Sequence, residues 1–195
     1  MNRQRAARDA RHRTRQDEII AAARRCFRQS GFHAASMAQL ASVASLSVGQ
    51  IYRYFPSKNA LIEEMIKRIV DGRVVAMSEQ NDLLHIADMI ARRETLNEED
   101  EMLMLEVAAE ASRNPRVREI LQRAEARLFH NACEKLRRDY PHLSEAQRAA
   151  CVEVLAVLIE GTAFRRLTTQ KASAELLYTL YKQMIHHLIT PSEDK

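Results

Sequence analysis

Residues that make tight turns are scarce in this chain, which has only four glycines and four prolines among 195 residues. A β-protein of this length needs many turns, and glycine and proline supply the backbone angles that turns require. Good helix formers, chiefly Ala, Leu, Glu and Arg, are abundant instead. Because apolar residues make up 46% of the chain, it can build a hydrophobic core. The sequence therefore predicts an all-α protein.

Charge is distributed unevenly along the chain. Residues 1–58 hold eleven Lys and Arg against three Asp and Glu, a net charge of +8, whereas the remainder holds nineteen against twenty-three, a net charge of −4. A basic segment of this size indicates a polyanionic partner, and we expect that partner to be double-stranded DNA. The alternative for the arginines between Arg3 and Arg15 is a basic tail surrounded only by solvent.

The sequence lacks the signals that are typical of secreted proteins, membrane proteins and several classes of enzyme. Cys26, Cys133 and Cys151 are far apart and odd in number, which favours reduced thiols and a cytoplasmic protein. No apolar run is long enough to span a membrane, so we expect no membrane partner. The seven histidines form no HxxxH or HExxH pair, and no GxSxG motif or phosphate-binding glycine loop occurs. We therefore expect no enzymatic activity, no cofactor and no metal site.

The apolar residues recur at helical spacing through most of the chain. This spacing predicts a first helix over 13–30, which Gly31 ends. Ser36 and Ser47 are suited to cap the second and third helices, and Pro56 cannot continue the third. Further helices are expected over 57–78, 82–93, 98–113, 116–138, 144–168 and 172–189.

The second and third helices, joined by a tight turn, fit a helix-turn-helix, in which the second helix of the pair enters the DNA major groove. Ile51 and Phe55 would face the core and leave polar side chains outward. Gln50 can bond adenine through two atoms, Arg53 can bond guanine, and Lys58 is placed to pair with phosphate. The alternative for the tyrosines is simple packing on the neighbouring helix. The predicted DNA-binding residues are Ser36, Ser47, Val48, Gly49, Gln50, Tyr52, Arg53, Tyr54 and Lys58.

The stretch SMAQLASVASLSVGQIYRYFPSKNALIEEMI, residues 36–66, resembles the DNA-binding region of the TetR/AcrR family of transcriptional regulators. The resemblance covers about residues 14–72. Two positions depart from the family pattern, because Ser45 occupies the turn position that is usually glycine and Ala35 replaces a hydroxyl. If Ser45 takes a positive φ, it costs roughly 1–2 kcal/mol. The motif is carried by Ser36, Leu40-Ala41, Ser47, Gly49, Ile51-Tyr52, Tyr54-Phe55 and Lys58.

The resemblance implies an Ω-shaped homodimer that represses transcription from a palindromic operator and is released by a small-molecule inducer. It also implies a domain plan for the chain. We expect a flexible basic arm over 1–13, a three-helix DNA-binding domain over 14–56, a connecting helix over 57–78, and a helical ligand-binding and dimerisation domain over 79–195.

The last two predicted helices are apolar on more than one face, which exceeds what a surface helix buries within its own chain. This favours a homodimer independently of the resemblance, although the same faces could instead fill a core within the chain. A second face of the helix over 144–168 carries Val154, Leu158, Gly161 and Arg165. The predicted dimer residues are Leu155, Ile159, Thr162, Arg166, Leu177, Tyr181, Met184 and Leu188.

The segment 82–138 mixes methionines and aromatic residues with glutamates. Methionine adapts to varied apolar ligands, and a carboxylate beside aromatic rings favours a lipophilic cation. This predicts a cationic drug or biocide as effector and an efflux-pump gene as target. The alternatives are a metabolite effector with metabolic target genes, or a membrane-surface or scaffold protein that uses the basic N-terminus. The predicted ligand residues are Met102, Glu106, Phe129, Cys133 and Phe164.

Overall fold

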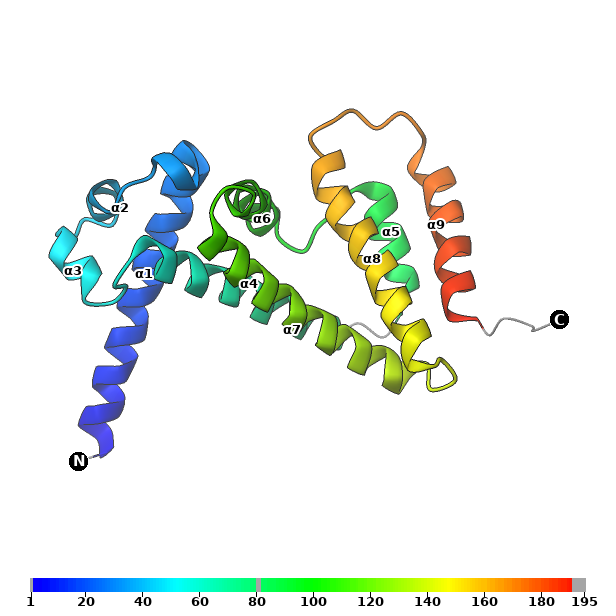
Figure 1. Cartoon of the computed structure of the whole chain (residues 1–195), viewed down its shortest axis with the longest axis horizontal. Coiled ribbons are helices and arrows are strands. Elements are labelled where there is room, and N and C mark those ends of the chain that lie inside the picture. Colours follow the sequence, from blue (N-terminus) through cyan, green and yellow to red (C-terminus); the bar gives the residue numbers. More distant parts are fainter. Residues whose placement is uncertain (1, 80–81, 191–195) are drawn as a thin grey trace. The chain divides into compact units, whose positions relative to one another are not determined.

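The computed structural model describes residues 2–79 and 82–190, and within these ranges every regular element is an α-helix (Figure 1). The predicted all-α fold is therefore confirmed. The helices are α1 (Asn2–Ala34), α2 (Met37–Val43), α3 (Val48–Tyr52), α4 (Lys58–Glu79), α5 (Leu84–Arg92), α6 (Glu98–Ala111), α7 (Pro115–Asp139), α8 (Glu145–Arg165) and α9 (Ala174–Ile189).

The first helix is longer than the sequence pattern predicted. It begins at Asn2, so residues 2–13, which the sequence predicted as a flexible basic arm, are helical. This stretch lacks apolar periodicity, but its alanines and arginines favour a helix and it contains no glycine or proline to break one. The chain kinks at Gly31, whose φ of 70° and ψ of 165° lie in a region open essentially to glycine alone.

Two capping boxes fix the starts of α2 and α3. The Ser36 and Ser47 hydroxyls accept from the main-chain N–H groups of Gln39 and Gln50, at 3.1 and 3.2 Å. The two glutamine side chains accept in return from the main-chain N–H groups of the serines, each at 2.8 Å. Between the helices, Ser45 takes a φ of 54°, the left-handed conformation expected if this turn position requires one.

The chain divides into two compact units, and each is described by itself. The first unit contains the chain up to Arg68 together with Met102–Gln122, and the second contains Ile69–Glu101 and the chain from Arg123 onward. The predicted boundary at residue 78 therefore differs from this division. Helices far apart in sequence pack together, so a boundary drawn along the sequence misses that α6 and the start of α7 belong with the N-terminal helices.

The first unit is built around aromatic and aliphatic side chains of α1 to α4. Phe27 and Phe32 stack with their ring centroids 4.4 Å apart, and both are fully buried. Outer ion pairs join elements distant in sequence, such as Arg68 with Asp17 at 2.5 Å and Arg116 with Glu63 at 3.7 Å. These contacts hold α1, α4 and the start of α7 in one unit.

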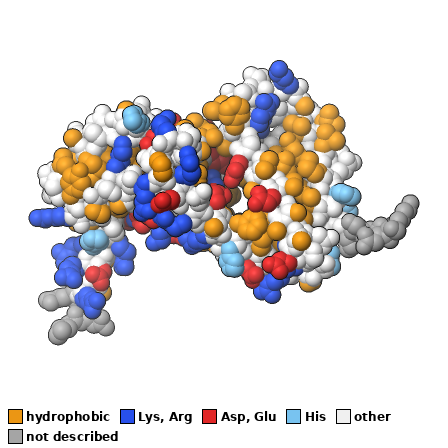
Figure 2. Space-filling model, viewed as in Figure 1, with side chains coloured by type: hydrophobic (Ala, Val, Ile, Leu, Met, Phe, Trp, Pro, Cys, Tyr) orange, Lys and Arg blue, Asp and Glu red, His pale blue; other side chains and the backbone are white. Residues whose placement is uncertain are grey.

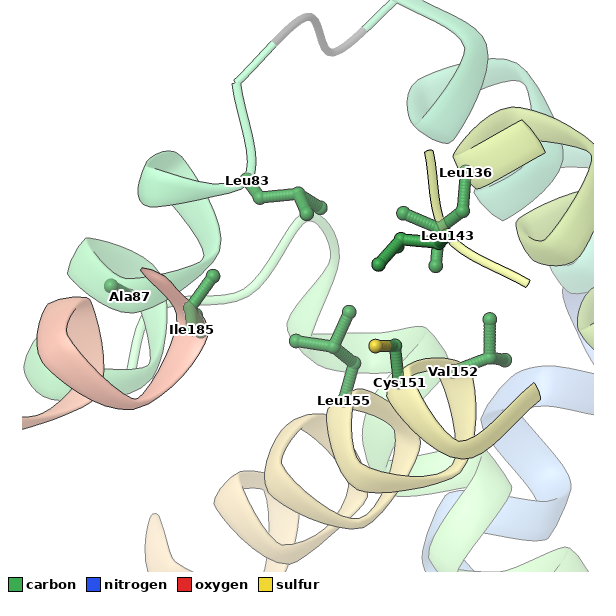
Figure 3. Close-up of a cluster of buried hydrophobic side chains, with 8 residues drawn as sticks. All are labelled: Leu83, Ala87, Leu136, Leu143, Cys151, Val152, Leu155 and Ile185. Carbon is green, nitrogen blue, oxygen red and sulfur yellow. The ribbon is translucent and has the colours of Figure 1, made fainter. Parts of the chain in front are cut away.

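The second unit has its own hydrophobic core, drawn from α5, α7, α8, α9 and the loop before α8 (Figure 3). Helix α5 packs against both α8 and α9. Ser144 caps α8 through a third capping box with Gln147. None of the helices in the described ranges is long and apolar enough to cross a membrane. The buried cluster comprises Leu83, Ala87, Leu136, Leu143, Cys151, Val152, Leu155 and Ile185.

Candidate nucleic-acid interface

Helix α3 and the turn after it bury one flank and expose the other. Ile51 and Phe55 are 0% and 3% exposed, as the sequence predicted, because they anchor this segment to the core of the first unit. On the opposite flank Gln50, Tyr52 and Arg53 are exposed to solvent. Val48 is also exposed, which fits its predicted place on the DNA side, and nothing lies within 4 Å of a Cβ built on Gly49. The apolar side of this short helix is thus packed on the core, and its polar side is exposed to solvent.

The helix itself is shorter than predicted. It spans only the five residues Val48 to Tyr52, with Arg53 as its C-cap, and so ends before Pro56, the limit that the sequence set. Gln50 is also less free than predicted. Its amide oxygen accepts a hydrogen bond from the Ser47 N–H at 2.8 Å. A bidentate contact with adenine requires both the oxygen and the NH2 group of glutamine, and here only the NH2 group is free.

Lys58 does not present a free cation. Its ammonium group donates to the main-chain carbonyls of Phe32, Ala35 and His33, at 2.6, 3.1 and 3.3 Å. An ammonium group has three protons, so these bonds use its full donor capacity. The structure therefore gives Lys58 a role within the first unit, and its phosphate contact stays a prediction. The sequence could not reveal this role, because the three carbonyls lie more than twenty residues away along the chain.

Tyr54 contacts α1 rather than standing free. Its ring lies 4.7 Å from the His12 ring, centroid to centroid, and it is partly buried. Tyr52, by contrast, is 47% exposed. Tyr54 thus packs on a neighbouring helix, the alternative that the sequence left open, whereas Tyr52 faces solvent as predicted. Ser36 is exposed at the start of α2 as predicted.

A buried carboxylate lies near the end of α6. Glu110 is 6% exposed and accepts from Arg113 at 2.9 Å and from Asn114 at 3.1 Å. Burial by itself would raise the pKa of Glu110, but the hydrogen bonds from Asn114 and Arg113 and the charges of Arg113 and His33 outweigh it, so the pKa is lowered. Glu110 therefore stays ionised within the first unit.

The predicted ligand residues are divided between the two units. Met102 and Glu106 belong to the first unit and are exposed, and the Glu106 carboxylate lies 3.3 Å from a Cβ built on Gly31. Phe129 and Cys133 pack against the core of the second unit, and Phe164 is 59% exposed. Helical spacing placed these residues on shared faces but could not assign the faces to one cavity.

Most of the predicted dimer residues are used within the chain. Leu155 and Thr162 are 8% and 7% exposed, and the Thr162 hydroxyl donates to the Leu158 carbonyl at 2.7 Å. Arg166 pairs with Glu98 and Glu101 of α6 at 3.4 and 3.5 Å. Tyr181 and Leu188 pack against the core cluster. Ile159 and Leu177 are partly buried, and Met184 is exposed. The alternative of an intrachain core is therefore correct for Leu155, Thr162, Tyr181 and Leu188.

A different face of the last two helices carries the exposed apolar side chains. Figure 2 shows hydrophobic side chains gathered over α8 and α9 on the side toward the viewer. A spacing of seven residues on α8 and of four residues on α9 places these side chains in a stripe along each helix. They are Val157 (66% exposed) and Phe164 (59%) on α8, and Leu176 (57%), Leu180 (51%) and Met184 (39%) on α9.

The sequence analysis did not single out Glu125, a carboxyl group of the second unit. Burial raises the pKa of Glu125, the neighbouring charge of Glu160 raises it further, and Arg73 partly offsets both. The sequence showed Glu125 only as one acid among many on a helix, because the pairing across α4, α7 and α8 depends on the fold. Among the described residues, no cluster of three or more His, Cys, Asp or Glu side chains is arranged to hold a metal ion.

Comparison with known proteins places the chain among bacterial regulators. Residues 19–65 match the family described as bacterial regulatory proteins, tetR family. The transcriptional regulator UidR of Escherichia coli is 30% identical over 123 residues, which cover 61% of this chain and 63% of UidR. The transcriptional regulator BetI of Yersinia pestis is 29% identical over 157 residues, covering 75% of this chain and 78% of BetI.

A solved structure shares the fold over almost the whole chain. GusR of Salmonella enterica superposes with a TM-score of 0.74 at 23% identity and covers 90% of this chain and 95% of its own. The matched family region coincides with α2, α3 and their supports, the segment whose outer flank is exposed. On this evidence residues 19–65 match the tetR family of bacterial regulatory proteins, and the chain as a whole has the fold of GusR.

Proposed function

We propose that this protein is a ligand-responsive transcriptional repressor, which binds a palindromic operator as a homodimer and leaves it when a small molecule binds. The observation that carries the proposal is the two-sided α3 segment, whose Ile51 and Phe55 are buried while Gln50, Tyr52 and Arg53 are exposed. A short helix fixed in this way can place side chains against base edges in the major groove. The match of residues 19–65 to the tetR family supports the same activity.

Arg53 is the residue we expect to read a base. It is exposed at the end of α3, and a guanidinium can bond the O6 and N7 atoms of guanine at once. Gln50 retains its NH2 group for a single donated bond, and Tyr52 and Val48 are placed to cover sugar or thymine methyl groups. Ser36 and Ser47 serve first as caps that set the direction of the two helices.

The homodimer of the proposal uses the exposed apolar stripe of α8 and α9. Val157, Phe164, Leu176, Leu180 and Met184 would bury each other across a twofold axis, which lets one surface patch pair with itself. Gly161, with nothing within 4 Å of an added Cβ, lies on α8 between Val157 and Phe164 and permits close approach of a partner helix. A twofold dimer in turn requires an operator with matching half-sites.

Release by an effector follows from linkage. A ligand that binds more tightly to the conformation unable to span successive major grooves shifts the dimer away from DNA, with a coupling of typically 1–3 kcal/mol. The effector's class is either a lipophilic cation or a metabolite. Adding compounds of each class to the operator complex and measuring release distinguishes the two.

The proposal is tested by footprinting the purified protein on genomic DNA from its source and then measuring binding to the protected sites. We expect a palindromic protected site, and we expect Arg53→Ala to relax base preference at one position of each half-site by about 1–3 kcal/mol. Arg137→Ala, which removes an exposed arginine of α7, is the matched control and should leave base preference unchanged. The absence of any protected site at low salt would refute the proposal.

A further inference from the structure

The N-terminal part of α1 projects beyond α2 and α3 (Figure 1). Its side chains form one wall of an open hollow. Arg8, Arg11 and Arg15 line the hollow, with His12 between them, and the Tyr54 ring lines it from the segment that follows α3. These α1 residues recur every three or four positions, so they share one face of the helix. Figure 2 shows basic and histidine side chains on this projecting end.

The hollow is positively charged despite one acidic neighbour. Glu18 also lines it and pairs with Arg15 at 2.5 Å, and the Arg11 guanidinium donates to the Ala7 carbonyl at 3.4 Å. Glu18 is thus balanced by Arg15, and Arg8 and Arg11 give the lining a net positive charge. Seven residues of helix rise about 10 Å from Arg8 to Arg15, a length that spans successive phosphates on one DNA strand.

The hollow is continuous with the proposed recognition segment. Tyr54 lies two residues after Tyr52, the last residue of α3, and its ring packs against His12 with centroids 4.7 Å apart. The same contact thus fixes the direction of the helical extension relative to the recognition segment. The arginine face of α1 thus adjoins the segment that follows α3.

We propose that this hollow holds the sugar–phosphate backbone of the operator beside each half-site, with Arg8 and Arg11 as its phosphate contacts and the His12–Tyr54 pair as the element that positions them. This inference rests on the proposed function and extends it, because it adds a sequence-independent contact surface outside the helix-turn-helix. Phosphate is the group that a row of arginines on one helix face binds, and the contact carries no base information.

The test compares Arg8→Ala and Arg13→Ala in the full-length dimer by operator binding from about 50 to 200 mM salt. Both variants remove one exposed arginine from the same helix, but Arg13 lies on the face opposite Arg11 and Arg15. Loss of two phosphate contacts per dimer lowers the salt slope by about 1.8, so wild type should lose roughly 12-fold more affinity than Arg8→Ala over this range. Arg13→Ala should keep the wild-type slope, and base preference should be unchanged in both.

Two further measurements separate the possible failures. His12→Ala should also weaken operator binding without altering base preference, because it frees the extension while leaving every arginine in place. Wild-type binding to a palindromic site combined with an unchanged slope in Arg8→Ala would overturn this inference and leave the proposed function standing. Loss of operator binding by wild type would refute the proposed function itself. Equal pelleting of wild type and Arg8→Ala with anionic phosphatidylserine vesicles is expected, and selective loss for Arg8→Ala without a change on DNA would reassign the hollow to a membrane surface.

Discussion

The ammonium group of Lys58 lies 2.6 Å from the main-chain oxygen of Phe32, and this bond ties the first turn of α4 to the chain just beyond the kink at Gly31. Two further carbonyls, those of His33 and Ala35, share the same ammonium group. Lysine at this position therefore holds the entry to α2 in place. We therefore expect Lys58 to affect DNA binding through the position of α2.

Lys58→Met should destabilise the first unit by about 1.5–3 kcal/mol, because it removes charge-assisted hydrogen bonds and leaves partly buried carbonyls unpaired. Urea denaturation followed by circular dichroism measures the loss. Operator affinity should fall while the salt slope stays at the wild-type value. A variant with wild-type stability and a lower salt slope would instead identify Lys58 as a phosphate contact.

Gly31→Ala and Gly72→Ala should have opposite effects on stability. Gly31 has a φ of 70° and a ψ of 165°, so an added Cβ strains the backbone at a cost of about 1–3 kcal/mol. Gly72 lies within α4 with nothing within 4 Å of an added Cβ, so alanine there should stabilise by about 0.5–1 kcal/mol. Thermal denaturation of both variants checks the pair. Equal changes in melting temperature would contradict the role given to the kink.

Leu180→Asp should convert the dimer to a monomer while leaving the chain folded. Leu180 is 51% exposed on α9, so a charge there is tolerated in the monomer but not in an apolar interface. Sedimentation velocity reports the change in mass, and circular dichroism reports the retained helix content.

Leu155→Ala is the contrasting variant, since Leu155 belongs to the core of the second unit. It should cost about 2–5 kcal/mol of stability and leave the folded protein dimeric. If Leu155→Ala yields a stable monomer and Leu180→Asp remains a dimer, the interface lies on the face that the sequence first indicated.

Glu125→Gln should raise the melting temperature at neutral pH. Burial and the Glu160 charge raise the pKa of Glu125 in the folded protein, so its ionised form opposes folding above that pKa. The opposition fades as the pH falls through the folded pKa and is absent below the unfolded value of about 4.3. The gain in melting temperature should therefore disappear in acid.

Glu134→Gln on the same helix is the matched control, with the opposite sign. Its hydrogen bond from Arg137 lowers the pKa of Glu134, so ionisation of this group favours the folded state at neutral pH. Because Glu134 is at the surface, the loss should be small. A melting temperature that rises equally in both variants would mean that surface charge, rather than the environment of Glu125, governs the effect.

Local signals in the sequence were sufficient for much of the molecule. Helix periodicity located α2 to α9 to within a few residues, serines with glutamines three residues later marked the capped starts, and the alternation of Ile51 and Phe55 with polar neighbours gave the exposed flank of α3. Each of these features depends on side chains within about one helical turn of each other, so it can be read from neighbouring residues in the sequence. The same is true of Ser45, whose positive φ belongs to a tight turn.

The tertiary structure alone decided the features that depend on distant partners. Lys58 has the sequence context of a phosphate ligand, but its ammonium group donates hydrogen bonds to main-chain carbonyls at the end of α1. Helices α8 and α9 have more than one apolar face, and packing within the second unit determines that Leu155 is buried and Leu180 exposed. A sequence specifies which faces of a helix are apolar, because that is a local pattern. Which of those faces meets its own core is settled by the free energy of packing the whole unit, to which every helix contributes.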